Sequence, residues 1–259
     1  STSHTQQQRA KQTSTATTYD SALTPIGRWA WGPCMGVDMR GHYAYIGNGF
    51  SFQILDITNL DAPILVGEYV TSELIYDVRL KGDSLAFVCN WDGFLIFDVS
   101  DPRTPEKLSE IPLWAANRVI PTDSFAYVAS GGLLSIIDIT DPRNPHIRSQ
   151  AAGDGGDGDR DQLALFNGRY VYLGDPEWPG WIYAYDCQNP DRIQYLPNLN
   201  IAWYSFSVYE RNGLLLVGAS TRIKVYGLTD PANPVLLGVD TLWAGYPIAG
   251  VTAGEFTPE

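Results

Sequence analysis

The fold is decided by the stretch Phe94-Leu-Ile-Phe-Asp98-Val-Ser-Asp-Pro-Arg-Thr-Pro105, because variants of it recur along the chain. Each variant begins with a short apolar run, continues into a polar turn and ends at a proline. The variants occupy residues 52–63, 94–105, 134–145, 182–190 and 223–234. Corresponding positions, from Asp56 to Gly227, are 42, 40, 48 and 41 residues apart. Self-similarity at such a period is typical of repeat architectures.

A second apolar stretch precedes each variant. These stretches lie at residues 42–46, 85–89, 125–128, 170–173 and 214–217. Short alternating strands separated by Gly, Asp and Pro exclude helices as the main element. Four strands in a unit of this length predict the blade of an all-β propeller. In the second unit we expect strands A, B, C and D at residues 75–80, 85–89, 94–99 and 106–111.

The repeated Asp residues fall in the turn between strands C and D. Asp and Ser/Thr side chains at such places are expected to bond nearby backbone N–H groups, and proline ends the strand ladder. A feature repeated in every unit is usually architectural. We therefore interpret these carboxylates as turn-forming and not catalytic.

The two ends of the chain bear on the number of blades. Residues 23–29 resemble a strand D, and residues 247–254 resemble a strand A. These two segments would belong to one closing blade that lacks strands B and C. We expect five full repeats plus a partial sixth closing blade, and a five-bladed ring is the alternative. Residues 1–22 are rich in Ser, Thr and Gln and are expected to form a flexible tail before a single propeller domain at residues 23–259.

Composition excludes several classes of protein. The chain has 29 acidic and 17 basic residues and a net charge of −12, which argues against a nucleic-acid binder. No apolar stretch is long enough to predict a transmembrane span. The cysteines Cys34, Cys89 and Cys187 form no zinc-binding or redox motif. A disulfide between Cys34 and Cys89 is conceivable, and the sequence does not decide it. The polar tail, the acidity and the abundant Trp and Tyr favour a secreted or surface protein.

The repeated phrase, with its Asp-[Ile/Val]-[Ser/Thr]-Asp-Pro-x-x-Pro turn, resembles the LVIVD repeat. That family consists of extracellular and surface β-propellers found largely in bacteria, and the resemblance covers roughly residues 25–242. The fourth unit departs from the pattern by losing its second proline, and the fifth has Gly227 in place of Asp. The resemblance implies a propeller and an exported location. It implies no defined reaction, so no catalytic residue is carried over.

Tryptophans gather at one predicted face. In a propeller the D–A and B–C loops share one face, while the A–B and C–D turns share the other. The tryptophans assigned to D–A and B–C loops are Trp31, Trp91, Trp114, Trp178, Trp203 and Trp243. They either plug the hub or pack between blades, or they line a depression that stacks on sugar rings or clasps a partner. We take these six as candidate ligand-binding residues.

The same face carries an acidic loop. Asp157, Asp159 and Asp161 have the spacing of the first three ligands of a calcium loop, although an EF-hand is excluded because Gly168 stands at position 12. A solvated Gly/Asp loop is the plainer interpretation. These three residues are candidate metal ligands, and Ca²⁺ is the one candidate cofactor.

The sequence favours a binding protein over an enzyme. The sequence has no nucleotide-binding motif, and none of its three histidines is expected at the face that carries the tryptophans. The remaining route to catalysis is a carboxylate pair drawn from Asp92, Asp175 or Glu177. The leading hypothesis is a non-catalytic extracellular propeller that binds a partner protein or a glycan, as a component of a surface assembly. The alternative is a carboxylate-based, calcium-assisted, carbohydrate-active enzyme.

Overall fold

The computed structural model describes residues 32–152, 162–174, 180–201, 205–219 and 222–241. The chain divides into two units, Ser1–Ala30 and Trp31–Glu259, and every described residue belongs to the second. No helix able to cross a bilayer occurs among these residues.

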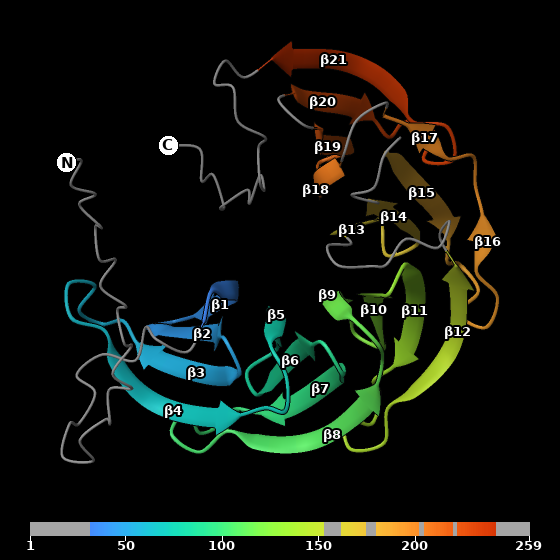
Figure 1. Ribbon diagram of the computed structural model, residues 1–259. Helices are drawn as coiled ribbons and strands as arrows, with labels where there is room; N and C mark the ends of the chain where they lie inside the picture. Colours follow the sequence, from blue (N-terminus) through green and yellow to red (C-terminus); the bar gives the residue numbers. More distant parts are fainter. Residues whose placement is uncertain (1–31, 153–161, 175–179, 202–204, 220–221, 242–259) are drawn as a thin grey trace, which may run out of the picture. The chain divides into compact units, whose positions relative to one another are not determined.

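The described strands form five antiparallel sheets in which strands adjacent in sequence lie side by side (Figure 1). Blades 1 and 2 consist of β1 (Cys34–Arg40), β2 (Tyr43–Asn48), β3 (Ser51–Asp56), β4 (Ile64–Val70), β5 (Ile75–Lys81), β6 (Leu85–Asn90), β7 (Gly93–Asp98) and β8 (Glu106–Pro112). Blade 3 consists of β9 (Ala116–Pro121), β10 (Phe125–Ser130), β11 (Leu133–Asp138) and β12 (His146–Ala152). Blade 4 consists of β13 (Gln162–Phe166), β14 (Tyr170–Gly174), β15 (Trp181–Asp186), β16 (Gln194–Tyr195) and β17 (Leu199–Asn200). Blade 5 consists of β18 (Ser205–Arg211), β19 (Leu214–Ala219), β20 (Arg222–Gly227) and β21 (Val235–Thr241).

These sheets confirm the predicted all-β propeller of four-stranded blades. In blade 2 each strand begins and ends within one residue of the range expected from the sequence. The five described blades coincide with the five full repeats. The segments that bear on a sixth blade, residues 23–29 and 247–254, lie outside the described residues.

Blade 4 departs from the pattern at its outer edge. Its fourth strand is divided into β16 and β17, which both pair with β15. Pro197 stands between them and has no N–H to donate to a strand ladder. The interruption therefore follows from the sequence.

The hydrophobic core lies between the blades. Tyr45 and Phe52 of blade 1 share a buried cluster with Phe97 of blade 2, and the rings of Phe52 and Phe97 are 5.0 Å apart. Similar clusters join blades 2 and 3, blades 3 and 4, and blades 4 and 5. Because both faces of a middle blade are buried, neighbouring residues on its second and third strands are apolar in succession.

The turns between the third and fourth strands are built as the sequence predicts. The Oδ1 atoms of Asp56, Asp98 and Asp138 each accept a backbone N–H from the residue two positions later, at 2.8–3.0 Å. The hydroxyl of the same Thr58, Ser100 or Thr140 donates to the carboxylate at 2.6 Å. These hydrogen bonds lower the pKa of all three carboxyl groups. The Ser/Thr side chains thus bond the Asp and not a backbone N–H, a small correction to the expectation.

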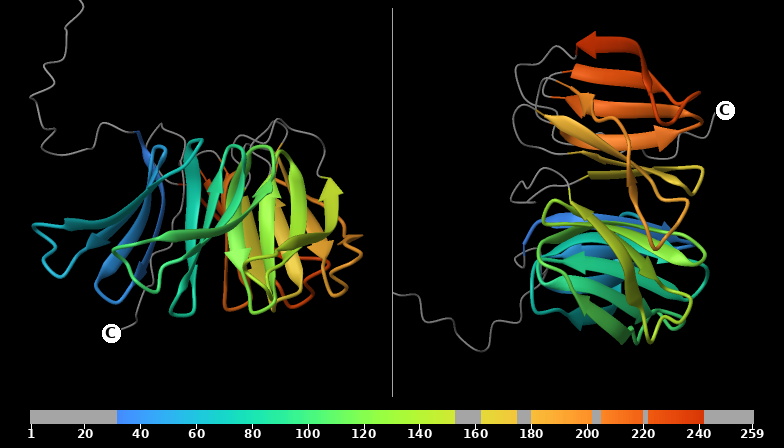
Figure 2. Two further views of the ribbon diagram at one scale, coloured as in Figure 1. Left: turned by 90° about the horizontal axis from the view of Figure 1, so that it is seen from below. Right: turned by 90° about the vertical axis from the view of Figure 1, so that its right-hand side faces the viewer.

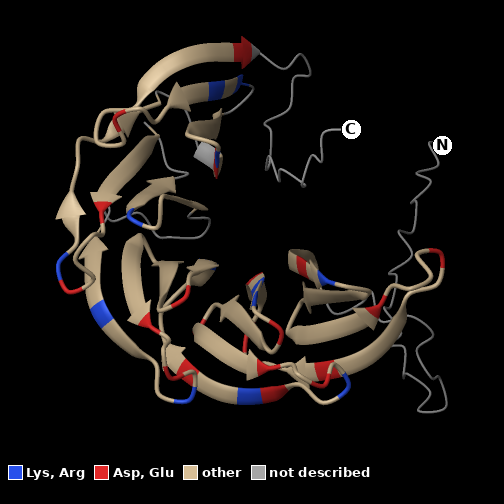
Figure 3. Cartoon of the chain, turned by 180° about the vertical axis from the view of Figure 1, so that it is seen from behind, with Lys and Arg blue, Asp and Glu red and all other residues tan. Residues whose placement is uncertain are grey.

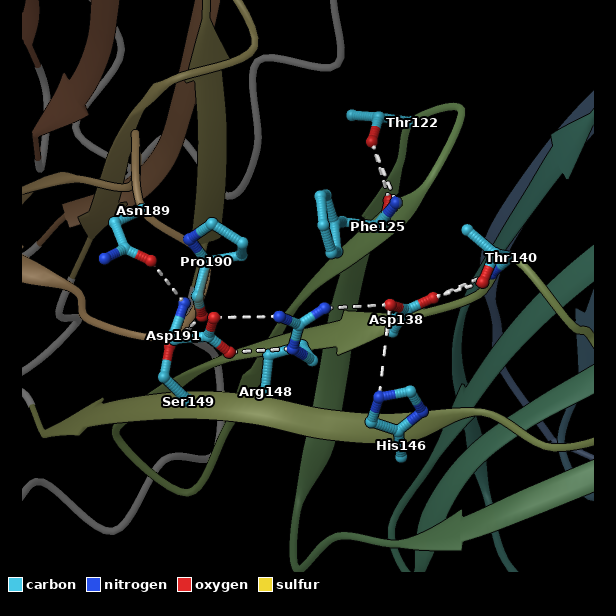
Figure 4. Close-up of polar contacts among 10 residues, drawn as sticks. All are labelled: Thr122, Phe125, Asp138, Thr140, His146, Arg148, Ser149, Asn189, Pro190 and Asp191. Carbon is cyan, nitrogen blue, oxygen red and sulfur yellow. Dashed lines mark hydrogen bonds and ion pairs between the residues drawn. The ribbon is translucent and has the colours of Figure 1, made fainter.

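One such turn is also tied to the next blade. Arg148 on β12 donates from Nε and Nη2 to the two carboxylate oxygens of Asp191, each at 2.8 Å, and from Nη1 to Asp138 at 3.1 Å (Figure 4). Figure 3 shows charged residues mainly at the ends of strands and along the outer strands. Charge is therefore concentrated where the blades meet water.

The strands run between two opposite ends, each formed by connections (Figure 2). One end carries the turns described above, at residues 57–63, 99–105, 139–145, 187–193 and 228–234, and we call it the turn end. Cys34, Cys89 and Cys187 are all free, so no Cys34–Cys89 disulfide is formed.

Candidate functional site

The opposite end of the blades is made by two kinds of connection that interlock. The N–H of Trp91, between β6 and β7, donates to the carbonyl of Leu74, between β4 and β5, at 3.2 Å. The N–H of Ala115, between β8 and β9, donates in turn to the carbonyl of Trp91 at 2.7 Å. We call this end, formed by residues 49–50, 71–74, 91–92, 113–115 and 131–132, the loop end.

Three aromatic side chains form a row at the loop end. The rings of Trp91 and Trp114 lie 5.9 Å apart in an edge-to-face arrangement, with an interplanar angle of 75°. The ring of Tyr76, at the start of β5, lies 5.8 Å from that of Trp91. Trp91 is half-buried, whereas Trp114 is 58% exposed. We call Tyr76, Trp91 and Trp114 the aromatic cluster.

The backbone around Trp114 fixes its position. Ala115 has a φ of 53°, a left-handed conformation that costs a non-glycine residue free energy and persists because the loop is tied down. Leu113 N–H donates to Asp92 O at 3.0 Å, and Gly131 N–H donates to Ala115 O at 3.3 Å. A Cβ on Gly131 would lie 2.4 Å from Cε3 of Trp114, so the indole rests directly on this glycine. The exposed ring is therefore held rigidly against its neighbours.

The aromatic cluster has the chemistry of a binding surface. An indole offers a large apolar face, and it loses little conformational entropy when it is already ordered. Asp92, the residue that follows Trp91, is exposed beside the cluster and can contribute a charged hydrogen-bond acceptor.

Only some of the predicted site residues lie in the part of the chain that the structure describes. Trp91 and Trp114 come together, while Trp31, Trp178, Trp203 and Trp243 lie outside the described residues. Trp181 begins β15 and packs against the core between blades 3 and 4. The candidate calcium ligands Asp157, Asp159 and Asp161 also lie outside the described part of the chain, as do Asp175 and Glu177. Within the described ranges no three His, Cys, Asp or Glu side chains form a group that could hold a metal ion.

One residue near the aromatic cluster was not singled out by the sequence analysis. Asn90, at the end of β6, is wholly buried, and neither Nδ2 nor Oδ1 has a hydrogen-bond partner. Its counterpart in blade 1, Asn48, donates from Nδ2 to Oε1 of Gln53 at 3.2 Å. The strand register places Leu95 of blade 2 where blade 1 has Gln53. Superposing the repeats would have revealed that Asn90 keeps the amide and has lost its partner.

The innermost strands carry a second polar feature that the sequence did not reveal. Asp77 of β5 is buried and accepts the N–H of Val119 in the next blade at 3.0 Å. Arg118 of β9 donates to the carbonyl of Tyr76 at 3.1 Å and to Gln162 of β13 at 3.2 Å. Arg79 and Arg118 also lie within 4 Å of the Asp77 carboxylate. These contacts link the inner strands of successive blades, which do not pair through their backbones.

The sequence of the first three blades matches a known repeat family. The family model for the LVIVD repeat matches residues 32–71, 76–109 and 115–150. Blades 1 to 3 therefore carry three LVIVD repeats. The matched segments coincide with blades 1 to 3, and blades 4 and 5 repeat the same strand order without matching that model. No curated protein matches the chain by sequence.

Solved structures resemble this chain in fold. A functionally unknown protein from Desulfotomaculum acetoxidans has a TM-score of 0.68 at 12% identity, over 85% of this chain and 74% of its own. A protein from Bacteroides fragilis described as a candidate 6-phosphogluconolactonase has a TM-score of 0.68 at 13% identity, over 82% and 72%. Sqt1 from Saccharomyces cerevisiae has a TM-score of 0.64 at 9% identity, over 84% and 64%. At these identities the likeness establishes the fold alone.

Proposed function

We propose that this protein is a non-catalytic, extracellular β-propeller that binds a partner protein or a glycan through its loop end, as a component of a surface assembly. The exposed indole of Trp114, held against Trp91, is the observation that carries the proposal. Burying a large apolar side chain stabilises a fold by about 1.5–3 kcal/mol. Trp114 is 58% exposed and so forgoes more than half of this stabilisation, and a binding role explains why the ring is left exposed.

The rigidity of the loop end supports recognition. Side chains that are already ordered lose little entropy when a ligand binds, so more of the contact free energy contributes to affinity. Tryptophan is also prominent among the residues that dominate binding energy at interfaces. The hydrogen bonds among Trp91, Ala115 and Gly131 supply that order.

The extracellular setting rests on the LVIVD repeats, on the acidic composition and on the polar residues 1–22. Its test is direct. In intact cells of the source organism, the protein should be cleaved by added protease or be found in the medium. Recovery only from the cytoplasmic fraction of lysed cells would contradict the setting.

The binding role is tested with the Trp114→Ala variant. The probes are a panel of soluble oligosaccharides, measured by calorimetry, and surface material of the source organism, captured on the immobilised protein with and without glycosidase treatment. For a ligand bound by the native protein, we expect Trp114→Ala to lose affinity by about 10–100-fold. Glycosidase sensitivity separates a glycan from a protein partner.

The matched control is Tyr195→Ala. Tyr195 is also an exposed aromatic residue that packs on one other ring, but it lies on the outermost strand of blade 4. We expect this variant to bind as the native protein does. Equal affinity of the native protein and Trp114→Ala for every bound ligand would contradict the proposal.

A further inference from the structure

The loop end and the turn end differ in the sign of their charged side chains. The residues that define the loop end include the acidic Glu73 and Asp92, and no lysine, arginine or histidine stands among them. The turn end carries both signs, because Arg103, Arg143 and Arg192 stand among its aspartates. The loop end, as the structure describes it, is therefore purely acidic.

The two carboxylates of the loop end have no basic partner within the described part of the chain. Asp92 is exposed and Glu73 is half-buried, and neither forms an ion pair with a described residue. Asp77 on the inner strand of blade 2 differs, because its carboxylate lies 3.2 Å from Arg79 and 3.9 Å from Arg118. Those two arginines face a carboxylate of their own, so the negative charge of the loop end is left for a ligand.

Backbone hydrogen bonds place Asp92 beside Trp114. The N–H of Leu113 donates to the carbonyl of Asp92 at 3.0 Å, and the N–H of Ala115 donates to that of Trp91 at 2.7 Å. Trp114 lies between these two bonds in the chain, opposite the Trp91–Asp92 pair. Asp92 and Trp114 therefore belong to one ordered surface.

Glu73 adjoins the aromatic cluster from a separate connection. It precedes Leu74, whose carbonyl accepts the N–H of Trp91 at 3.2 Å. The carbonyl of Glu73 accepts the hydroxyl of Thr71 at 2.8 Å, and this bond orders the connection between β4 and β5. A second carboxylate thus adds to the negative charge at the same rings.

The indole of Trp114 has one open face. Gly131 lies against one side of the ring, and the rings of Trp91 and Trp114 meet edge to face 5.9 Å apart. Because Trp114 is nonetheless 58% exposed, the side turned away from Gly131 is open. The quadrupole of an aromatic ring attracts a cation placed over its face, and tryptophan attracts it most strongly.

We propose that the loop end binds an arginine-bearing segment of a partner protein, with the guanidinium stacked on the open face of Trp114 and paired with Asp92. A guanidinium is planar, so it stacks on an aromatic ring while its N–H groups donate to a carboxylate. The ammonium of lysine is a compact point charge that does not stack in this way. The inference rests on the proposed function and narrows it, since it selects a protein partner and the charge that this partner carries.

Charge favours this partner over two other occupants. A neutral glycan would stack on the indole and would leave both carboxylates without a counter-charge. A choline headgroup is a cation, but its methyl groups do not donate conventional hydrogen bonds to Asp92. The net charge of −12 also attracts a basic segment during association, as complementary potentials do at other interfaces.

The test uses short Gly/Ser peptides that differ only in a central residue, which is arginine, lysine or citrulline, the neutral isostere of arginine. Binding to the full chain is followed by the indole N–H signals in NMR spectra, and Trp114→Phe identifies the signal of Trp114. We expect the arginine peptide to shift this signal and to bind about tenfold more tightly than the citrulline peptide. Its affinity should fall as salt is added.

Three outcomes of the peptide experiment would overturn the proposal. The first is no shift of the Trp114 signal by the arginine peptide, and the second is equal affinity for the arginine and citrulline peptides. The third is a lysine peptide that binds as tightly as the arginine peptide, because charge alone would then account for binding without a stacked guanidinium.

The carboxylate is tested with Asp92→Asn, which removes the charge and keeps the shape of the side chain. We expect this variant to bind the arginine peptide about tenfold more weakly and the citrulline peptide as the native protein does. The matched control is Asp83→Asn, because Asp83 is an exposed aspartate of the same blade, in the turn between β5 and β6 at the opposite end. The control should bind as the native protein does. No loss in Asp92→Asn, or equal losses in the two variants, would contradict the proposal.

Failure of this inference can be told apart from failure of the proposed function. The surface material captured by the native protein is tested in parallel with Trp114→Ala and Asp92→Asn, and we expect both variants to lose it. Loss in Trp114→Ala alone would leave the proposed function standing and would rule out the arginine partner. Release of the captured material by glycosidase, or a larger shift of the Trp114 signal by phosphocholine than by the arginine peptide, would likewise rule it out.

Discussion

The two ends of the blades are built on the same strands and yet differ in kind. At the turn end, Asp56, Asp98 and Asp138 make the same pair of hydrogen bonds to the residue two positions later. At the loop end, the corresponding two-residue turns read Gly-Phe, Trp-Asp and Gly-Gly in blades 1, 2 and 3. Turns that are the same in each repeat serve the architecture, whereas loops that differ in sequence between blades are available to recognise a ligand. Three changes can break or sharpen this comparison.

The largest effect is expected at the turn end, from Gly67→Ala. The new methyl group would lie 2.0 Å from the carbonyl oxygen of Pro102, and neither backbone can move without disturbing the contact between blades 1 and 2. We expect the free energy of unfolding to fall by about 3 kcal/mol. Chemical denaturation measures it.

Gly238→Ala is the control for this change. The same strand position in blade 5 has open space, so the free energy of unfolding of the isolated chain should change by less than about 0.5 kcal/mol. Similar losses for the two variants would show that the glycine of blade 1 is needed for its backbone and not for the docked turn.

How much of this could be read from the sequence depends on how local each feature is. The turn end could be predicted because Asp98 and Ser100 interact over two residues, and the strands of blade 2 follow from the alternation on either side. The position of the Trp114 ring could not be predicted, because the indole rests on Gly131, a residue of the next blade. Asn90 was missed although a comparison of the repeats shows Leu95 in place of Gln53, because its lack of a partner is decided on the adjoining strand. The division of the outer strand in blade 4, in contrast, could have been anticipated from Pro197.

A pair of asparagines at the loop end gives the next largest effect. In Asn48→Ala the amide of Gln53 loses a buried partner, and we expect the free energy of unfolding to fall by about 2 kcal/mol. In Asn90→Ala two polar atoms without partners are removed, so the loss should stay below about 1 kcal/mol. Chemical denaturation of both variants provides the comparison. If Asn90→Ala costs as much as Asn48→Ala, Asn90 bonds an ordered internal water in solution.

The smallest effect compares one aspartate from each end. Asp98→Ala removes the acceptor of the Ser100 N–H and hydroxyl, and we expect the free energy of unfolding to fall by about 1 kcal/mol, limited by the solvent around this carboxylate. Asp92→Ala removes an exposed carboxylate at the loop end and should change the same quantity by less than about 0.5 kcal/mol. The two substitutions change charge equally, so net charge cannot account for a difference.

The dependence of stability on pH tests the contribution of Asp98 further. Hydrogen bonds from Ser100 lower the pKa of Asp98 in the folded protein. The contribution of Asp98 is therefore complete above the unfolded-state pKa of about 3.9, and it is lost as the pH falls through the lower folded-state pKa. The stability difference between the native protein and Asp98→Ala should thus be constant near neutral pH and should shrink in acid. A difference that stays constant down to the acid limit of folding would mean that the turn is held by its backbone and prolines alone, and the turn end would then owe nothing to its repeated carboxylates.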